Sequence, residues 1–181
     1  MTAEPLPNLE IRLAGPDDVP AVAAIHVEGY ESAHRGILSD ENLAVRTLEL
    51  RRRVWGERLA DPPERSFVLV AVIDGEVVGF ISGRASRPDE DDGEGLGRWE
   101  DIYVSSRHKP RSRIAAPLAH AAYERYRELG YPGVVGFFAE GNDRARLYLD
   151  SVGMRPDGHT VVVDGSLLHR VRFDLGGEPA A

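Results

Sequence analysis

The chain has 181 residues, 42% of them hydrophobic and 29% charged, a composition that supports one folded domain with one substantial core. It has no cysteine, which excludes disulfides, thiolate metal sites and a cysteine nucleophile, and its formal net charge of -8 disfavours general nucleic-acid binding. The charge is compatible with a cationic substrate, although solubility is the simpler explanation. Since we find neither a long apolar run nor a charged-then-apolar leader, we expect a cytoplasmic protein without a membrane span or a secretory signal.

The first part of the chain is predicted to contain one strand and two helices. Residues 9–13 alternate as a short strand does, and after a turn with helix-capping residues the apolar residues recur at helical spacing over 19–26. A loop is expected over 29–36. A second helix is expected from Asp40, which can cap it, to about Leu59, before two consecutive prolines. Its apolar stripe is predicted to consist of Leu43, Leu50 and Val54.

The middle of the chain is predicted to form a hairpin and one further strand. Two β-rich runs, 66–72 and 76–83, flank an Asp-Gly pair at 74–75, which is a strong signal for a tight antiparallel turn. Residues 87–97 are rich in proline, glycine and acidic side chains and lack periodicity, which indicates a solvated loop. This loop leads to a strand over about 98–104.

The last part of the chain is predicted to alternate helices and strands. Apolar residues at helical spacing indicate a long helix over 114–129, and 133–139 has the continuous apolar character of a buried strand. A short helix is expected over 143–152, followed by two strands over 158–163 and 167–175. This last strand pair offers an edge at which two copies of the chain could associate as a homodimer.

Three local patterns occur in order along the chain. They are IRLAGPDDVPAVAAIHVEGYESAHRGILSDE, DGEVVGFISG and EGNDRARLYLDSVGMRP. Together with the predicted order of helices and strands, they resemble the GCN5-related N-acetyltransferase (GNAT) family over about residues 11–173. The resemblance implies an α/β (α+β) fold, in which a central, mixed, mostly antiparallel twisted sheet of about seven strands is flanked by about four helices. We expect a single domain over 9–175, between tails at 1–8 and 176–181.

This resemblance also implies an activity and a cofactor. Members of the family transfer an acetyl group from acetyl-CoA to an amine, here expected on a small molecule. Their fourth and fifth strands part to hold the pantetheine arm, and the loop after the fourth strand cradles the pyrophosphate at the amino terminus of a helix. Carried over to this chain, the implied cofactor-binding residues are Ile102, Tyr103, Val104, Lys109, Arg111, Ser112, Arg113 and Asn142.

The cofactor loop departs from the family's pattern of small residues. The sites that favour glycine fall on Pro110, Ser112 and Ile114, of which Pro110 has no amide hydrogen and Ile114 brings a branched side chain toward the phosphates. The loop instead carries a cluster of cations, which could bind phosphate through their side chains or lie in solvent. These are Arg107, His108, Lys109, Arg111 and Arg113.

Acetyl transfer to an amine needs a general base and a general acid. Regular alternation over 98–104 puts Glu100 on one face of the strand and Asp101 on the other, and Glu100 is the predicted base; the alternative is an ordinary carboxylate in water. At the family's tyrosine position the chain has Leu149, and Tyr148 lies one residue earlier. Tyr148 is the predicted acid, with core packing as the alternative.

The acceptor pocket is implied to lie at the loop that follows the first helix. The residues expected to line it are Tyr30, Glu31, His34, Arg35 and Trp99. The histidines lack metal-ligand spacing, so we expect no metal, and we expect neither a nucleic-acid nor a membrane partner.

Two functions stay open on these grounds. The first is an N-acetyltransferase that uses acetyl-CoA on an amine of a small molecule. The second is a repurposed or inactive member of the same fold, which binds another ligand as a self-resistance module or runs different chemistry in the same cleft. The missing glycines and Leu149 favour the second function. The element order, which extends along nearly the whole chain, favours the first, and we retain it.

Overall fold

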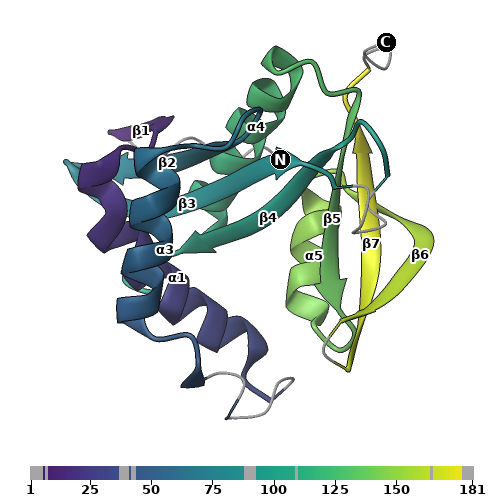
Figure 1. The fold of residues 1–181 in the computed structure, drawn as a ribbon, viewed down its shortest axis with the longest axis horizontal. Helices are drawn as coiled ribbons and strands as arrows, with labels where there is room; N and C mark the ends of the chain where they lie inside the picture. The colour runs from purple at the N-terminus through teal and green to yellow at the C-terminus, as the bar shows by residue number, and fades with distance from the viewer. Residues whose placement is uncertain are drawn as a thin grey trace.

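The structure is a computed structural model that describes residues 6, 8–36, 41, 44–87, 93–108, 110–163 and 165–176. Its strands form one seven-stranded sheet in the order β1-β2-β3-β4-β5-β7-β6 (Figure 1). The strands are β1 (Leu9–Leu13), β2 (Phe67–Ile73), β3 (Glu76–Ala85), β4 (Gly97–Val104), β5 (Gly133–Ala139), β6 (Arg155–Val163) and β7 (Ser166–Asp174). The helices of the described residues are a 3-10 turn, η1 (Pro16–Asp18), and α1 (Val19–His34), α3 (Leu48–Ala60), α4 (Ser112–Glu128) and α5 (Asp143–Ser151).

The sheet is mixed and mostly antiparallel. Only β4 and β5 run parallel among its neighbouring pairs. The β2–β3 hairpin turns at Asp74 and Gly75, whose φ angles of 50° and 83° are the left-handed pair that a type I′ turn requires. The predicted α/β fold, with its seven strands and four helices, is confirmed in element order and in strand number.

The strands β4 and β5 are joined only where they begin. Their parallel pairing consists of Gly97 with Val134 and Arg98 with Val135. Beyond these pairs the two strands diverge, as Figure 1 shows, whereas β5 stays paired with β7 along its whole length. The carboxyl half of β4 therefore has one edge free of strand pairing.

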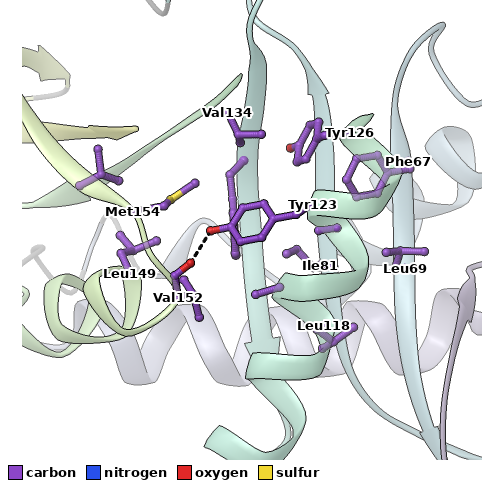
Figure 2. Packing of buried hydrophobic residues seen from close by; sticks show 14 of the residues in the cluster. Phe67, Leu69, Ile81, Leu118, Tyr123, Tyr126, Val134, Leu149, Val152 and Met154 are labelled. Carbon is purple, nitrogen blue, oxygen red and sulfur yellow. Dashed lines mark hydrogen bonds between the residues drawn. The ribbon is translucent and has the colours of Figure 1, made fainter. Parts of the chain in front are cut away.

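Each face of the sheet carries its own hydrophobic core. On one face, α1 and α3 cover β2 and β3, with Val22, Trp55 and Phe80 among the fully enclosed side chains. Figure 2 shows the core on the other face, where α4 and α5 pack. There the Tyr123 hydroxyl of α4 donates a 3.0 Å hydrogen bond to the carbonyl of Val152, which ties α4 to the end of α5.

The first helix is longer than the sequence predicts. The predicted loop over 29–36 is wrong as far as His34, because α1 continues through Gly29. Glycine is needed at this position since a Cβ atom added there would lie 2.6 Å from Cγ of Tyr103 on β4. This close approach brings the carboxyl half of α1 directly against β4.

The next described helix, α3, also begins elsewhere than predicted. It starts at Leu48 and is capped by Thr47, whose hydroxyl oxygen accepts a hydrogen bond from an amide of the first turn. The predicted apolar stripe is wrong at Val54, which is exposed, while Trp55 and Leu59 are buried. The predicted cap and first stripe residue, Asp40 and Leu43, lie outside the described residues.

The helix α4 begins at Ser112, slightly before the predicted start. Pro117 lies inside it and cannot donate a hydrogen bond to the carbonyl one turn earlier. The helix nevertheless continues to Glu128, because one face of it is buried in the core. None of the helices in the described part of the chain is long and apolar enough to cross a membrane.

Candidate active site

A cavity of about 680 Å³ opens where β4 and β5 diverge. The end of α1 and β4 form one side of it, and β5 and α5 form the other. The first turn of α4 closes one end. The segments that contribute to its lining include 28–30, 32–34, 98–104, 111–112, 136–139 and 144–145.

A β-bulge in β4 sets the direction of the two acidic residues in this wall. Ser82 of β3 pairs with Asp101, but the next residue, Gly83, pairs with Trp99, so Glu100 is the extra residue. Side chains therefore change faces at this point. Glu100 bonds to Arg58 of α3 and Asp101 to Ser82, which places both carboxylates on the face that α1 and α3 cover. The predicted alternation, which put them on opposite faces, is wrong.

Glu100 is held by two arginines. Its Oε1 accepts a 2.7 Å hydrogen bond from Nε of Arg84, and its Oε2 lies 2.6 Å from a guanidinium nitrogen of Arg58. Burial alone would raise the pKa of Glu100, but the charges and hydrogen bonds of these two arginines outweigh it and hold the pKa below its usual value. The carboxylate lines the cavity, yet it is a weak proton acceptor.

Asp101 has the opposite electrostatic character. Burial, followed by the neighbouring charge of Glu100, raises the pKa of Asp101 to about 6. The Ser82 hydroxyl donates a long hydrogen bond, 3.3 Å, to Oδ2 of Asp101. A carboxylate with a pKa near 6 is mostly ionised at neutral pH and still accepts a proton readily. Asp101 is thus better suited to base chemistry than Glu100.

A buried histidine lies behind Asp101. Nε1–H of Trp55 donates to Nδ1 of His26 at 3.2 Å, and Nε2 of His26 lies 4.0 Å from Oδ1 of Asp101. Burial, and then the nearby arginine charges, lower the pKa of His26 to about 3, so the imidazole is neutral. Because its Nδ1 accepts a hydrogen bond, its one proton belongs on Nε2, on the side of the Asp101 carboxylate.

Tyr148 and Leu149 both line the cavity, from α5. The Tyr148 hydroxyl donates a 2.9 Å hydrogen bond to the carbonyl of Ala115 in the first part of α4. Burial raises the pKa of Tyr148 above its usual value, so the phenol keeps its proton at neutral pH. The sequence placed Tyr148 on a face suited to core packing, and the structure shows it in contact with the core and also on the cavity wall.

The predicted cofactor loop ends in the first turn of α4, and this turn faces the cavity without the obstruction that its sequence suggests. Arg111, Ser112 and Ala115 line the cavity at the first turn of α4. The side chain of Ile114 turns away from the cavity into the core, where it is only 1% exposed. The prediction that Ile114 brings a branched side chain toward a bound phosphate is therefore wrong. Pro110 is exposed, and it does not belong to the cavity lining.

The other predicted cofactor residues are divided between the cavity and its surroundings. Ile102, Tyr103 and Val104 line the cavity, as does Asn142. The Asn142 side-chain oxygen caps α5 by accepting from the amide of Ala145 at 3.0 Å. Two predicted residues are not placed in the cavity: Arg113 is outside its lining, and Lys109 is outside the described residues.

The predicted acceptor residues are divided in the same way. Tyr30, His34 and Trp99 line the cavity, and the rings of Tyr30 and His34 stack with centroids 4.1 Å apart. Glu31 and Arg35 form an ion pair with each other on the exposed side of α1 and are not part of the cavity lining.

Sequence reasoning missed several residues of this site. It named Asp101 without giving it a role, and it gave no role to His26, Arg46 or Arg144. An unusual histidine in the apolar stripe of the first helix was the one available signal, because a buried histidine needs a partner. Among the described residues, no group of three or more histidines and carboxylates could hold a metal ion.

Comparisons with known proteins agree on one family and one fold. The model of the acetyltransferase (GNAT) family matches residues 30–154. No curated protein matches the sequence significantly. PaiA N-acetyltransferase from Thermoplasma acidophilum, solved in complex with coenzyme A, has a TM-score of 0.73 at 14% identity, over 91% of this chain and 99% of that chain.

Two further solved structures are similar. YncA from Salmonella typhimurium, solved with its cofactor acetyl-CoA, has a TM-score of 0.71 at 19% identity, over 96% of this chain and 98% of that chain. Ribosomal-protein-alanine N-acetyltransferase from Brucella melitensis has a TM-score of 0.69 at 24% identity, over 91% of this chain and 99% of that chain. At these identities the likeness concerns the fold.

Proposed function

The chain belongs to the acetyltransferase (GNAT) family, and from this premise we propose that it transfers the acetyl group of acetyl-CoA to an amine of a small molecule. The observation that carries the proposal is the cavity at the divergence of β4 and β5, with the first turn of α4 at one end and a high-pKa carboxylate in its wall. Two of the similar structures contain coenzyme A or acetyl-CoA, which supports the same cofactor here.

The residues of the cavity fit acetyl-CoA. Because β4 pairs with β5 only at Gly97 and Arg98, the backbone of 102–104 has polar groups available for the amides of a pantetheine arm. The amino terminus of α4 carries a partial positive charge and favours phosphate. Arg111 at the start of α4 and Arg144 of α5 also line the cavity and would add full positive charge.

The missing glycines do not argue against this assignment. Glycine is needed where a side chain would stand between backbone and phosphate. At Ile114 the side chain is taken up by the core instead. Pro110 lacks an amide, but its carbonyl accepts from Arg113 in the turn that starts α4, so the proline helps to form the helix start.

Asp101 is the proposed base. Acetyl-CoA supplies an acetyl thioester, so the carbon–sulfur bond breaks as the carbon–nitrogen bond forms. Asp101 accepts the proton that the amine nitrogen loses, and neutral His26 orients the carboxylate from behind. Tyr148, still protonated at neutral pH, is the proposed acid for the leaving sulfur, which requires its hydroxyl to turn from the carbonyl of Ala115.

The experiment that tests this function is direct. The full chain is incubated with acetyl-CoA and a panel of primary amines, and thiol release is followed together with the mass of each amine. We expect a mass gain of one acetyl group on at least one amine, and little gain with Asp101→Asn. If no amine in a broad panel gains an acetyl group while the protein is folded, the proposed function is wrong.

A further inference from the structure

Two arginines at the α1 and α3 side of the cavity are not used by the proposed mechanism. Arg46 lines the cavity, and its guanidinium lies over the ring of Tyr30, 4.1 Å from the centroid. Arg51, in the first turns of α3, is half-buried, and it lies close enough to Arg46 and Asp101 for their charges to shift its pKa. Arg46 thus belongs to the cavity wall, and Arg51, which is not part of the lining, adds positive charge near Arg46 and Asp101.

Neither guanidinium has an ion pair or a hydrogen-bond partner among the described residues, and Nε of each is buried without one. The carboxylates of the cavity wall have other partners or none. Glu100 is bound by Arg58 and Arg84, and Glu28 accepts from the amide of Ser106 at 2.9 Å. A cation removed from water without a partner costs free energy, so this arrangement favours the arrival of an anion.

The stacking of Arg46 on Tyr30 favours a planar anion. A guanidinium that lies on an aromatic face keeps its in-plane N–H groups free, and these groups match both oxygens of a carboxylate. The second cation, Arg51, lowers the cost of bringing a negative charge near Asp101. This local excess of positive charge occurs on a chain whose formal net charge is -8.

From this juxtaposition we propose that the acceptor amine also carries a carboxylate, as amino acids do. Arg46 binds the carboxylate, nearby Arg51 adds positive charge, and the amine nitrogen lies at Asp101. This inference depends on the proposed acetyl transfer and specifies the class of its acceptor.

The first test compares each amino acid with its primary amide, which has the same side chain and no negative charge. We expect kcat/KM for the acid to exceed that for the amide by at least about tenfold, as the loss of a hydrogen-bonded charge contact predicts. Arg46→Gln with Arg51→Gln should remove this preference, so that the ratio of kcat/KM for the acid to kcat/KM for the amide falls toward one. Equal kcat/KM for acids and amides in the wild type would overturn the inference.

Two control variants separate charge from position. Arg53→Gln removes the same charge from an exposed site on α3 and should leave the preference intact. Arg46→Lys keeps the charge but loses the planar fork, and should fall between the wild type and Arg46→Gln. If Arg53→Gln lowers the preference as much as Arg46→Gln does, general electrostatics explains the effect and the inference is wrong.

Binding without chemistry distinguishes this inference from the proposed function. The same acids and amides are added to the full chain without acetyl-CoA, and the shift of Tm is measured. If the acids raise Tm through Arg46 and Arg51 but no amine is ever acetylated, the carboxylate site stands and the proposed function fails. If acetylation occurs but acids are neither preferred as substrates nor stabilising, the proposed function stands and the carboxylate site fails.

Discussion

Asp101→Asn is expected to make the protein more stable and less active at the same time. The pKa of Asp101 rises from 3.8 to about 6 on folding, so the folded protein holds this proton more tightly than the unfolded chain does. The stabilising effect of the proton is complete below pH 3.8 and is lost as pH rises through about 6. At neutral pH the ionised carboxylate therefore costs up to about 3 kcal/mol, which the amide avoids.

The stability difference should depend on pH in a defined direction. In urea unfolding, Asp101→Asn should exceed the wild type by up to about 3 kcal/mol at pH 7.5 and by about half of that at pH 5. The asparagine keeps an oxygen on the side of Nε2–H of His26, so the local packing is preserved. The rate of acetyl transfer should fall by about 10²–10⁴-fold, and the wild-type ionisation near pH 6 should vanish from the profile of kcat/KM.

Glu100→Gln is the control, and it is expected to change the stability of the protein in the opposite direction. Glu100→Gln leaves Arg58 and Arg84 without their shared carboxylate, so it should destabilise the protein by on the order of 3 kcal/mol. It should retain an ionisation in the profile of kcat/KM, because Asp101 is still present, but at a lower pH than in the wild type, since the charge of Glu100 no longer raises the pKa of Asp101. The reasoning is refuted if Asp101→Asn destabilises the protein as Glu100→Gln does, or if it keeps the wild-type rate.

Three further substitutions, the first with Gly56→Ala as its control, test the site and its surroundings. Gly29→Ala places a Cβ 2.6 Å from Cγ of Tyr103 and should lower both Tm and turnover, whereas Gly56→Ala, with nothing within 4 Å, should raise Tm slightly. Equal Tm for the two variants would contradict the close approach of α1 to β4. Ile114→Ala should cost about 2–5 kcal/mol in urea unfolding without improving acetyl-CoA affinity in calorimetry; tighter binding would mean that this side chain does obstruct the phosphates. Tyr148→Phe should lower kcat and leave the Kd for acetyl-CoA unchanged, and an unchanged kcat would remove it as the acid.

The fold could be predicted because its signals are local. The signals for the Asp-Gly turn at 74–75, the buried strand over 133–139 and the start of the short helix at 143 each extend over a few residues, and all three features appear where the sequence predicts them. The resemblance to a family then supplied the single mixed sheet into which the strands assemble. The early end predicted for α1 was wrong because Gly29 does not mark a turn. Glycine is required there because α1 packs closely against Tyr103.

The chemistry of the site could not be predicted in the same way. Alternation assumes a regular strand, and one extra residue at Glu100 turned two acids to one face. Alignment with the family's glycine pattern assigned Ile114 to the phosphate site from its position along the chain. It could not give the direction of the side chain, which points into the core. Arg51 comes near Asp101 only through tertiary packing, which brings together parts of the chain that are distant in the sequence.

The most direct test of the whole account is a calorimetric titration of acetyl-CoA into the full chain near neutral pH. If the cavity between β4 and β5 is a cofactor site, the titration should show saturable heat with a Kd in the micromolar range and one molecule bound per chain. The absence of any heat at millimolar acetyl-CoA, from protein that is shown to be folded, would contradict the account.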